Sequence, residues 1–359
     1  MIRMKKFLLL ALFGLGSDAF LIRHKIQHAV HKAEPQPAVY NTAEELAQQY
    51  TEYSALVHAA LTEEKTFSTF KSQPCYMKIL EHVTEEQGKM YLHFLQEDYP
   101  DLLNDMSLAK ELSRNNQIGC PPILARYPSL AKTLLEEVSP TQLRYLKVLG
   151  DVRALLARSG HDERDQTSEN PLDGCRIAEV GVGYGGQAQC ILASCGSIAH
   201  YDLFDLPEVE DLAAKYLKET LQGGSATAWR KRPSPEKKGG GGGSYDLFIS
   251  NYALSELTRA LQEKYLEDLA SRASSGYVTW NSNIHDSDRM TAREFANALK
   301  TLGKDVVVEA ECPLTSHGNK LVTWTTPGLP CEFRRVAPRD DHATDGAGDG
   351  PAIMISEGV

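Results

Sequence analysis

Between residues 176 and 325 the sequence alternates between short apolar runs and amphipathic stretches, and this alternation limits most strongly what the chain can fold into. Short apolar runs bounded by glycine or polar residues indicate buried strands, whereas longer stretches with apolar residues three and four positions apart indicate helices. Strands that alternate with helices are typical of a parallel sheet with helices on both faces. The predicted strands are Arg176–Val180, Ile198–Phe204, Asp246–Ser250, Gly276–Asn281, Val306–Glu311 and Lys320–Thr325, and the predicted helices are Gly186–Ser194, Glu208–Leu221, Ser255–Ser271 and Arg289–Leu302.

The last two predicted strands, Val306–Glu311 and Lys320–Thr325, break the alternation. The segment between them contains Pro313 and Gly318 and is too short for the crossover that two parallel strands need. The two strands must therefore form a hairpin, so that one of them runs antiparallel at the edge of a parallel sheet. The sequence thus predicts a Rossmann-like α/β fold of the class I methyltransferase type, with an antiparallel C-terminal hairpin strand, and not a plain dinucleotide-binding fold.

The chain ahead of this sheet has a helical pattern. One helix is expected over Lys78–Asp98, and another begins near Ser139, which is a good N-cap with Pro140 at the first helical position. We therefore expect a helical N-terminal region over residues 20–160. It would pack onto, or cover, a methyltransferase domain over residues 172–327.

Both ends of the chain are expected to lie outside this fold. Residues 1–19 combine a basic start with an apolar run over Phe7–Leu15, which is the order found in a cleaved secretory signal. We therefore expect the secretory pathway (the ER or Golgi lumen, or the extracellular space) and no membrane span after cleavage. An uncleaved membrane anchor and an organelle-targeting segment are the alternatives. Residues 328–359 are rich in Gly, Asp, Ala and Pro, and we expect a disordered tail.

Charge and cysteine usage restrict the partners. The formal net charge is −10, so the chain as a whole repels phosphate backbones and no nucleic-acid partner is expected. The basic run 230–232 is interpreted as a solvated loop. The seven cysteines form no CxxC motif and no Cys/His cluster with zinc spacing, so no metal site is expected. Cys175 and Cys190 are expected to be small apolar core residues. Whether any of the other cysteines form a disulfide is left open.

The segment Glu179–Gly186 (EVGVGYGG) follows a predicted strand and opens a predicted helix. Its glycines allow a tight turn and a close approach of the backbone to a ligand, and a helix N-terminus favours negative charge. Asp205 follows about twenty residues later, where an acid would bond ribose hydroxyls. A nicotinamide cofactor also fits this spacing. However, Glu179 places a carboxylate near the amino group of a cationic cofactor, which favours S-adenosylmethionine. The residues expected to bind it are Glu179, Gly181, Gly183, Tyr184, Gly185, Asp205, Leu206 and Asn251.

Several of these segments together resemble a known family. They are Ser139–Leu149, Glu179–Gln187, Asp205–Val209, Ser250–Leu257, Pro313–Thr315 and Gly318–Lys320, and they span roughly half of the chain. The chain resembles the family of sugar O-methyltransferases. The resemblance implies methyl transfer to a sugar or glycoconjugate hydroxyl. A small non-sugar acceptor is one alternative, and a cofactor-binding or glycan-binding protein without turnover is another.

The expected reaction is an in-line displacement, in which the protein aligns the acceptor oxygen and removes its proton. The fold is similar to that of plant-type small-molecule O-methyltransferases, and this similarity puts Glu256 near the position of their catalytic histidine. Glu256 is therefore the first candidate for the base, with a helix cap or a structural ion pair as the alternative. His285 is the second candidate, with an ordinary surface loop as the alternative. Tyr252, His317 and Asn319 are expected to contact the acceptor, although a core or turn role is open for the first two.

Overall fold

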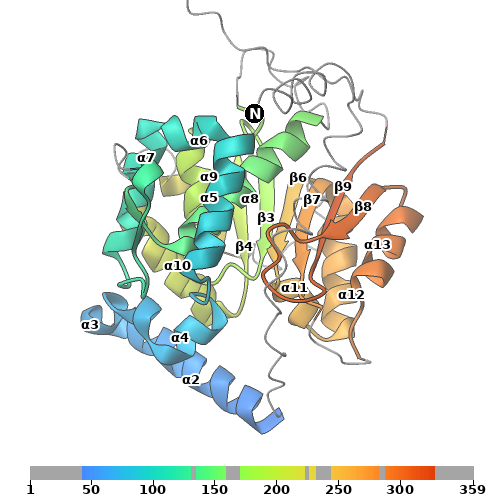
Figure 1. Cartoon of the computed structure of the whole chain (residues 1–359). Coiled ribbons are helices and arrows are strands. Elements are labelled where there is room, and N and C mark those ends of the chain that lie inside the picture. The colour runs from blue at the N-terminus through green and yellow to red at the C-terminus, as the bar shows by residue number, and fades with distance from the viewer. Residues whose placement is uncertain are drawn as a thin grey trace, which may run out of the picture.

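The computed structural model describes residues 43–130, 135–158, 170–222, 226–231, 244–282 and 288–327. Within these residues a seven-stranded mixed sheet lies between two layers of helices (Figure 1). The strand order is β5-β4-β3-β6-β7-β9-β8. The strands are β3 (Arg176–Val180), β4 (His200–Phe204), β5 (Trp229–Lys231), β6 (Tyr245–Asn251), β7 (Ala273–Trp280), β8 (Asp305–Ala310) and β9 (Lys320–Thr325).

The C-terminal hairpin forms as predicted, but the antiparallel strand does not lie at the edge. Strand β9 pairs antiparallel with both β7 and β8, so β8 is the outer strand. The burial of the two strands explains this order, because β9 buries Leu321, Val322 and Trp324, whereas β8 exposes Val307 and Val308. A strand with apolar side chains on both faces needs cover on both faces, which only an inner position gives. The resulting order is that of the class I methyltransferase fold.

Strand β3 marks the switch point of the sheet. Its parallel neighbours are β4 on one side and β6 on the other, so the chain leaves β3 toward one half of the sheet and later returns to the other half. Open α/β sheets bind ligands in the crevice outside the carboxyl ends of the strands at such a point. Helices α9 (Gly186–Ser194) and α10 (Pro207–Thr220) follow β3 and β4, and the bounds of β3 and α9 are those predicted.

The two helical layers bury the two faces of the sheet. Helices α8 (Pro140–Arg158), α9 and α10 cover one face, and α11 (Ala253–Glu256), α12 (Arg259–Asp268) and α13 (Ala292–Thr301) cover the other (Figure 1). Side chains alternate along β3. Ile177 therefore packs in the core beneath α8, α9 and α10, and Ala178 packs in the core beneath α11, α12 and α13. The helix predicted over Ser255–Ser271 is in fact two, because the chain turns between α11 and α12.

The helices before α8 pack on the first layer, where α5 contacts α8, α2 contacts α10 and α7 contacts α9 (Figure 1). The single helix predicted over Lys78–Asp98 is wrong. Thr84 interrupts it, because its side chain accepts a hydrogen bond from Gln87 N at 3.2 Å and starts a new helix with a capping box. The helices are α2 (Ala43–Thr62), α3 (Glu64–Phe67), α4 (Pro74–Ile79), α5 (Glu85–Asp98), α6 (Pro100–Asn104) and α7 (Met106–Ser113), and the short strands β1 (Ala125–Arg126) and β2 (Glu137–Val138) follow them.

The structure corrects the expectation for the basic run and agrees with that for two of the cysteines. The basic run is not a loop where it is described, because Arg230 and Lys231 lie in β5, and Arg230 Nη2 donates to Asp202 at 2.9 Å. Cys175 and Cys190 are buried as expected, and no disulfide joins the cysteines among the described residues. None of the helices in the described ranges is long and apolar enough to cross a membrane. The expected signal segment, the C-terminal tail and His285 lie outside the described residues.

Candidate cofactor and acceptor site

The glycine loop joins β3 to α9 and holds three glycines with positive φ. Gly181, Gly183 and Gly185 have φ of 82°, 52° and 90°, which side chains rarely tolerate. Packing also excludes a side chain at Gly181 and crowds one at Gly183. A Cβ at Gly181 would lie 2.0 Å from Ala253 Cβ, and one at Gly183 would lie 2.9 Å from Leu80 Cδ1. The loop is therefore held between α11 on one side and the N-terminal helices on the other.

Asp205 stabilises this loop from the end of β4. One carboxylate oxygen accepts a hydrogen bond from Gly183 N at 3.1 Å, and the other accepts one from Leu206 N at 2.8 Å. Burial raises the pKa of Asp205 to about 6, against the effect of these backbone donors. Asp205 thus lies beside the glycine loop, as the predicted ribose contact requires, and it also fixes the shape of that loop. Helix α2 passes nearby, where Ser54 Oγ lies 3.4 Å from Glu208 Oε1.

Glu179 is a buried carboxylate, and the charged neighbour that acts on it within the described residues is another acid, Asp205. Glu179 is 2% exposed and accepts a hydrogen bond from the Tyr201 hydroxyl at 2.7 Å. Burial raises its pKa to about 8, and the charge of Asp205 acts in the same direction. No ion pair of Glu179 occurs within the described part of the chain. A cation beside Glu179 would relieve this unfavourable burial, which is what the sequence predicted for the amino group of the cofactor.

Tyr184, predicted to contact the cofactor, instead points into the helical layer. Its side chain is 1% exposed, its hydroxyl donates to Asn115 Oδ1 at 3.3 Å, and the Lys71 ammonium lies 4.2 Å from its ring centroid. Lys71 also donates to Asn115 Oδ1, at 2.8 Å. Tyr184 therefore anchors the glycine loop to the N-terminal helices, and we assign it a packing role.

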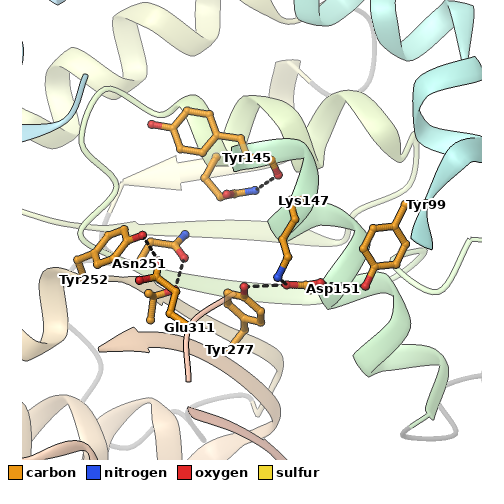
Figure 2. A network of polar contacts seen from close by, with 10 residues as sticks. Tyr99, Tyr145, Lys147, Asp151, Asn251, Tyr252, Tyr277 and Glu311 are labelled. Atoms are coloured by element: carbon orange, nitrogen blue, oxygen red, sulfur yellow. Dashed lines mark hydrogen bonds and ion pairs between the residues drawn. The ribbon is translucent and has the colours of Figure 1, made fainter. Parts of the chain in front are cut away.

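Two of the three predicted acceptor contacts meet at one carboxylate that sequence reasoning missed. The Tyr252 hydroxyl donates to Glu311 Oε1 at 2.5 Å, and Asn319 Nδ2 donates to Glu311 Oε2 at 3.0 Å. Thr315 adds two further donors to Glu311, from its hydroxyl at 2.6 Å and its backbone N–H at 3.1 Å. Figure 2 shows Tyr252 and Glu311 facing each other beside Asn251. His317 is exposed in the same turn and is not one of these donors.

Tyr252 has a strained backbone, with φ 69° and ψ −38°. Such a conformation in a residue other than glycine costs free energy, and it is found most often at functional sites. It follows directly after Asn251 at the carboxyl end of β6 and so turns the chain sharply toward α11. The strain therefore coincides with the edge of the sheet at which ligands bind in this fold.

A small cavity of about 20 Å³ lies beside this cluster. This volume accommodates about one water molecule. The side chains around it come from α5, α8, β6, β7 and the loop before β9. They include Tyr91, Arg144, Lys147, Tyr252, Tyr277 and Glu311.

A polar network adjoins the cavity on the side of α8 (Figure 2). Lys147 donates to Asp151 at 2.5 Å, and the hydroxyls of Tyr277 and Tyr99 each donate to Asp151 at 2.8 Å. Arg144, Lys147 and Asp151 are spaced three and four positions apart along α8, which places them on one face of the helix. Their spacing along α8 is visible in the sequence, but its significance depends on the burial that the packing of α5 on α8 creates.

Glu256, the first candidate for the base, ends α11 on the other side of β6. Its side chain is half-buried, and desolvation of the carboxylate raises its pKa. Asn281, just beyond β7, donates to it at 3.4 Å. Glu256 is not a member of the cluster around Glu311, so the structure holds two separate carboxylates at this edge of the sheet. Within the described ranges, no three His, Cys, Asp or Glu side chains gather in a way that could hold a metal ion.

Comparison with known proteins adds distant likenesses. No family profile matches the chain, and no curated protein matches it. Among solved structures, it is similar to the methyltransferase domain of bacterial CtHen1 (14% identity, TM-score 0.36, covering 50% of this chain and 97% of that one). It is also similar to magnesium protoporphyrin IX methyltransferase (ChlM) from Synechocystis PCC 6803 with bound SAM (15%, TM-score 0.36, 52% and 83%). A third is the N-terminal domain of EvdMO1 with SAH bound (14%, TM-score 0.32, 42% and 74%). The assignment of the fold rests on the strand order of the sheet itself.

Proposed function

We propose that this protein is an S-adenosylmethionine-dependent methyltransferase. The observation that carries the proposal is the position of Glu179, a buried carboxylate without an ionic partner in the described structure, directly before the glycine loop at the switch point of the sheet. A nicotinamide cofactor would bring its negatively charged pyrophosphate to this loop. The cationic methionine end of S-adenosylmethionine instead complements the carboxylate.

The residues at the loop fit this cofactor. Glu179 would hold the amino group, the backbone of Gly181 and Gly183 would lie along the methionine part, and Asp205 with Leu206 would face the ribose. When bound, S-adenosylmethionine supplies a methyl group on a positively charged sulfur. The protein's own task is to align the acceptor oxygen with that methyl group and to receive its proton.

The acceptor we propose is a hydroxyl of a sugar or glycoconjugate. The resemblance in sequence supports it, and so does the cluster of hydroxyl and amide groups around Glu311. Glu256 remains the first candidate for the base, because burial holds its pKa above the ordinary value and favours proton uptake. Glu311 is the second candidate, acting through the Tyr252 hydroxyl at 2.5 Å. A small non-sugar acceptor is the alternative substrate.

We also propose that the protein works in the secretory pathway, on the basis of the basic and apolar residues at positions 1–19. Sequencing the N-terminus of the protein secreted from cells tests this. A mature chain that begins near residue 20 supports cleavage. An intact N-terminus on a membrane-bound or organellar protein would favour the alternatives.

Calorimetric titration of the full-length protein with S-adenosylmethionine, with NAD as the control, tests the proposed function. We expect S-adenosylmethionine to bind and NAD not to bind. A screen with a labelled methyl group and a panel of sugars then tests for transfer to a hydroxyl. Binding of NAD alone would refute the proposal. Binding of S-adenosylmethionine without transfer to any acceptor would favour a protein that has lost turnover.

A further inference from the structure

The cavity beside the Glu311 cluster is lined by a buried arginine that has no ionic partner among the described residues. Arg144 is 6% exposed, and its Nη1 has no hydrogen-bond partner among the described residues. Its guanidinium carbon lies 5.5 Å from the ring centroid of Tyr145 and 5.4 Å from that of Tyr252. Contacts with aromatic faces compensate a buried cation only in part, and a buried charge is costly unless an opposite charge accompanies it. No acidic side chain of the described residues therefore balances the charge of Arg144 by direct contact.

The other charged groups that line the cavity already have partners. Lys147 is paired with Asp151 at 2.5 Å. Glu311 accepts hydrogen bonds from Tyr252, Thr315 and Asn319, which satisfy both of its oxygens. Lys147 is itself a cation, and Glu311 is already engaged by other donors, so neither group balances the charge of Arg144.

Glu81 is the remaining acid near Arg144. It is 4% exposed and its charge acts on Arg144, but the two side chains form no ion pair in the described structure. Its Oε1 also has no hydrogen-bond partner among the described residues. Glu81 therefore acts on Arg144 through its charge, without the direct bidentate contact for which a guanidinium is suited.

We propose that Arg144 binds a carboxylate of the acceptor, so that the substrate is an acidic sugar of the uronate class. This inference rests on the proposed function and names its substrate class. A carboxylate is planar and matches the two-pronged guanidinium, and it is smaller than a tetrahedral phosphate. The cavity of about 20 Å³ has room for about one water molecule, so it would admit a carboxylate oxygen while the sugar ring stays outside.

The position of the cavity suits this role. Asn251 and Tyr252, which line it, follow the carboxyl end of β6, and β6 pairs directly with β3, from which the glycine loop emerges. A sugar whose carboxylate enters the cavity would thus extend its ring and hydroxyls toward the loop. Arg144 would be a specificity-determining residue, fixing the ring while a base acts on one hydroxyl.

The test measures sugar binding and needs no turnover. The full-length protein is titrated with D-glucuronate and D-galacturonate, with the neutral sugars D-glucose and D-galactose, and with D-glucose 6-phosphate. Each titration is run with and without S-adenosylhomocysteine. Loss of a hydrogen-bonded charged contact weakens binding by about ten- to a hundredfold, so we expect this preference for each uronate over its neutral sugar.

Two variants on the same helix locate the preference. Arg144→Met removes the charge and keeps an apolar stem, whereas the control Arg153→Met removes a charge that pairs with Asp101 at the surface, at 3.2 Å. We expect Arg144→Met to lose the preference for uronates, to bind S-adenosylhomocysteine as before, and to keep or raise the melting temperature without ligand, because it removes an unpaired buried charge. Arg153→Met should keep the preference.

Three results would overturn the inference. They are equal binding of uronates and neutral sugars by the natural protein, an unchanged preference in Arg144→Met, and binding of D-glucose 6-phosphate without binding of uronates. Failure to bind S-adenosylhomocysteine is a different result, because it is measured without sugar and counts against the proposed function. The titrations run without S-adenosylhomocysteine still decide whether Arg144 selects a carboxylate.

Discussion

Replacing Glu179 by glutamine should make the protein more stable and its cofactor binding weaker. Glutamine has nearly the same shape, and its carbonyl oxygen can still accept the hydrogen bond from the Tyr201 hydroxyl at 2.7 Å. The substitution therefore removes only the ability to carry a buried negative charge. If Glu179 served only to stabilise the fold, its replacement would instead lower the free energy of unfolding.

The pKa of Glu179 sets the size and the sign of this effect. The pKa is raised from 4.5 to about 8 in the folded protein, so the folded state holds a proton that the unfolded chain releases between these values. Stability from this group is complete below pH 4.5 and is lost as the pH rises toward 8. At 1.36 kcal/mol per pKa unit, the loss reaches at most about 5 kcal/mol. Glu179→Gln should thus unfold like the natural protein near pH 5 and be several kcal/mol more stable at pH 8.5.

Denaturant unfolding at these two pH values measures the first half of the prediction, and calorimetry with S-adenosylmethionine measures the second. Loss of the carboxylate should weaken cofactor binding by about ten- to a hundredfold, which corresponds to a hydrogen bond to a charged group. The control is Asp202→Asn. Asp202 is equally buried but pairs with Arg230, so this variant should lose stability at pH 8.5. Destabilisation of Glu179→Gln at pH 8.5, or normal cofactor binding by this variant, would contradict the role assigned to Glu179.

Three further predictions concern the loop and the base. Gly181→Ala should lower the free energy of unfolding by about 2 kcal/mol or more, because its Cβ would lie 2.0 Å from Ala253 Cβ. The double variant with Ala253→Gly should recover the packing part in denaturant unfolding and leave only the cost of the positive φ. Asp205→Ala should weaken S-adenosylmethionine binding about tenfold in calorimetry without unfolding the protein, since Gly183 N loses its acceptor; an unchanged affinity would count against this site. Glu256→Gln should lower turnover at least tenfold and spare cofactor affinity, and near-normal turnover would remove it from the mechanism.

The parts of the fold that depend on local pattern could be predicted. Strand β3 and helix α9 have the expected bounds, because apolar residues, glycines and helical spacing follow one another without interruption from Arg176 to Ser194. Strand β5 could not be predicted, since it is short and carries Arg230 and Lys231. Its place depends on pairing with β4, where Asp202 is the partner of Arg230. The order of β8 and β9 likewise depends on which strand is buried on both faces.

The cofactor side of the site was more predictable than the acceptor side, because it depends on local pattern and less on partners distant in the sequence. Glu179 and the glycines form one continuous segment, and Asp205 follows at the end of the next strand. Tyr184 belongs to that segment too, but the direction of its side chain depends on Lys71 and Asn115, which come from the N-terminal helices. Spacing along the chain identifies a backbone that binds a ligand, but not which way a neighbouring side chain points.

The acceptor side shows what the N-terminal helices contribute. On an isolated helix, the polar face of α8 with Arg144, Lys147 and Asp151 would be taken for a solvated surface. Helix α5 packs on α8 and removes this face from water, so each charge then needs a partner. Asp151 provides one for Lys147, whereas the described structure provides none for Arg144. The covering helices thus turn a surface stripe into a site with one unmatched positive charge, and an acidic acceptor is the ligand that would match it.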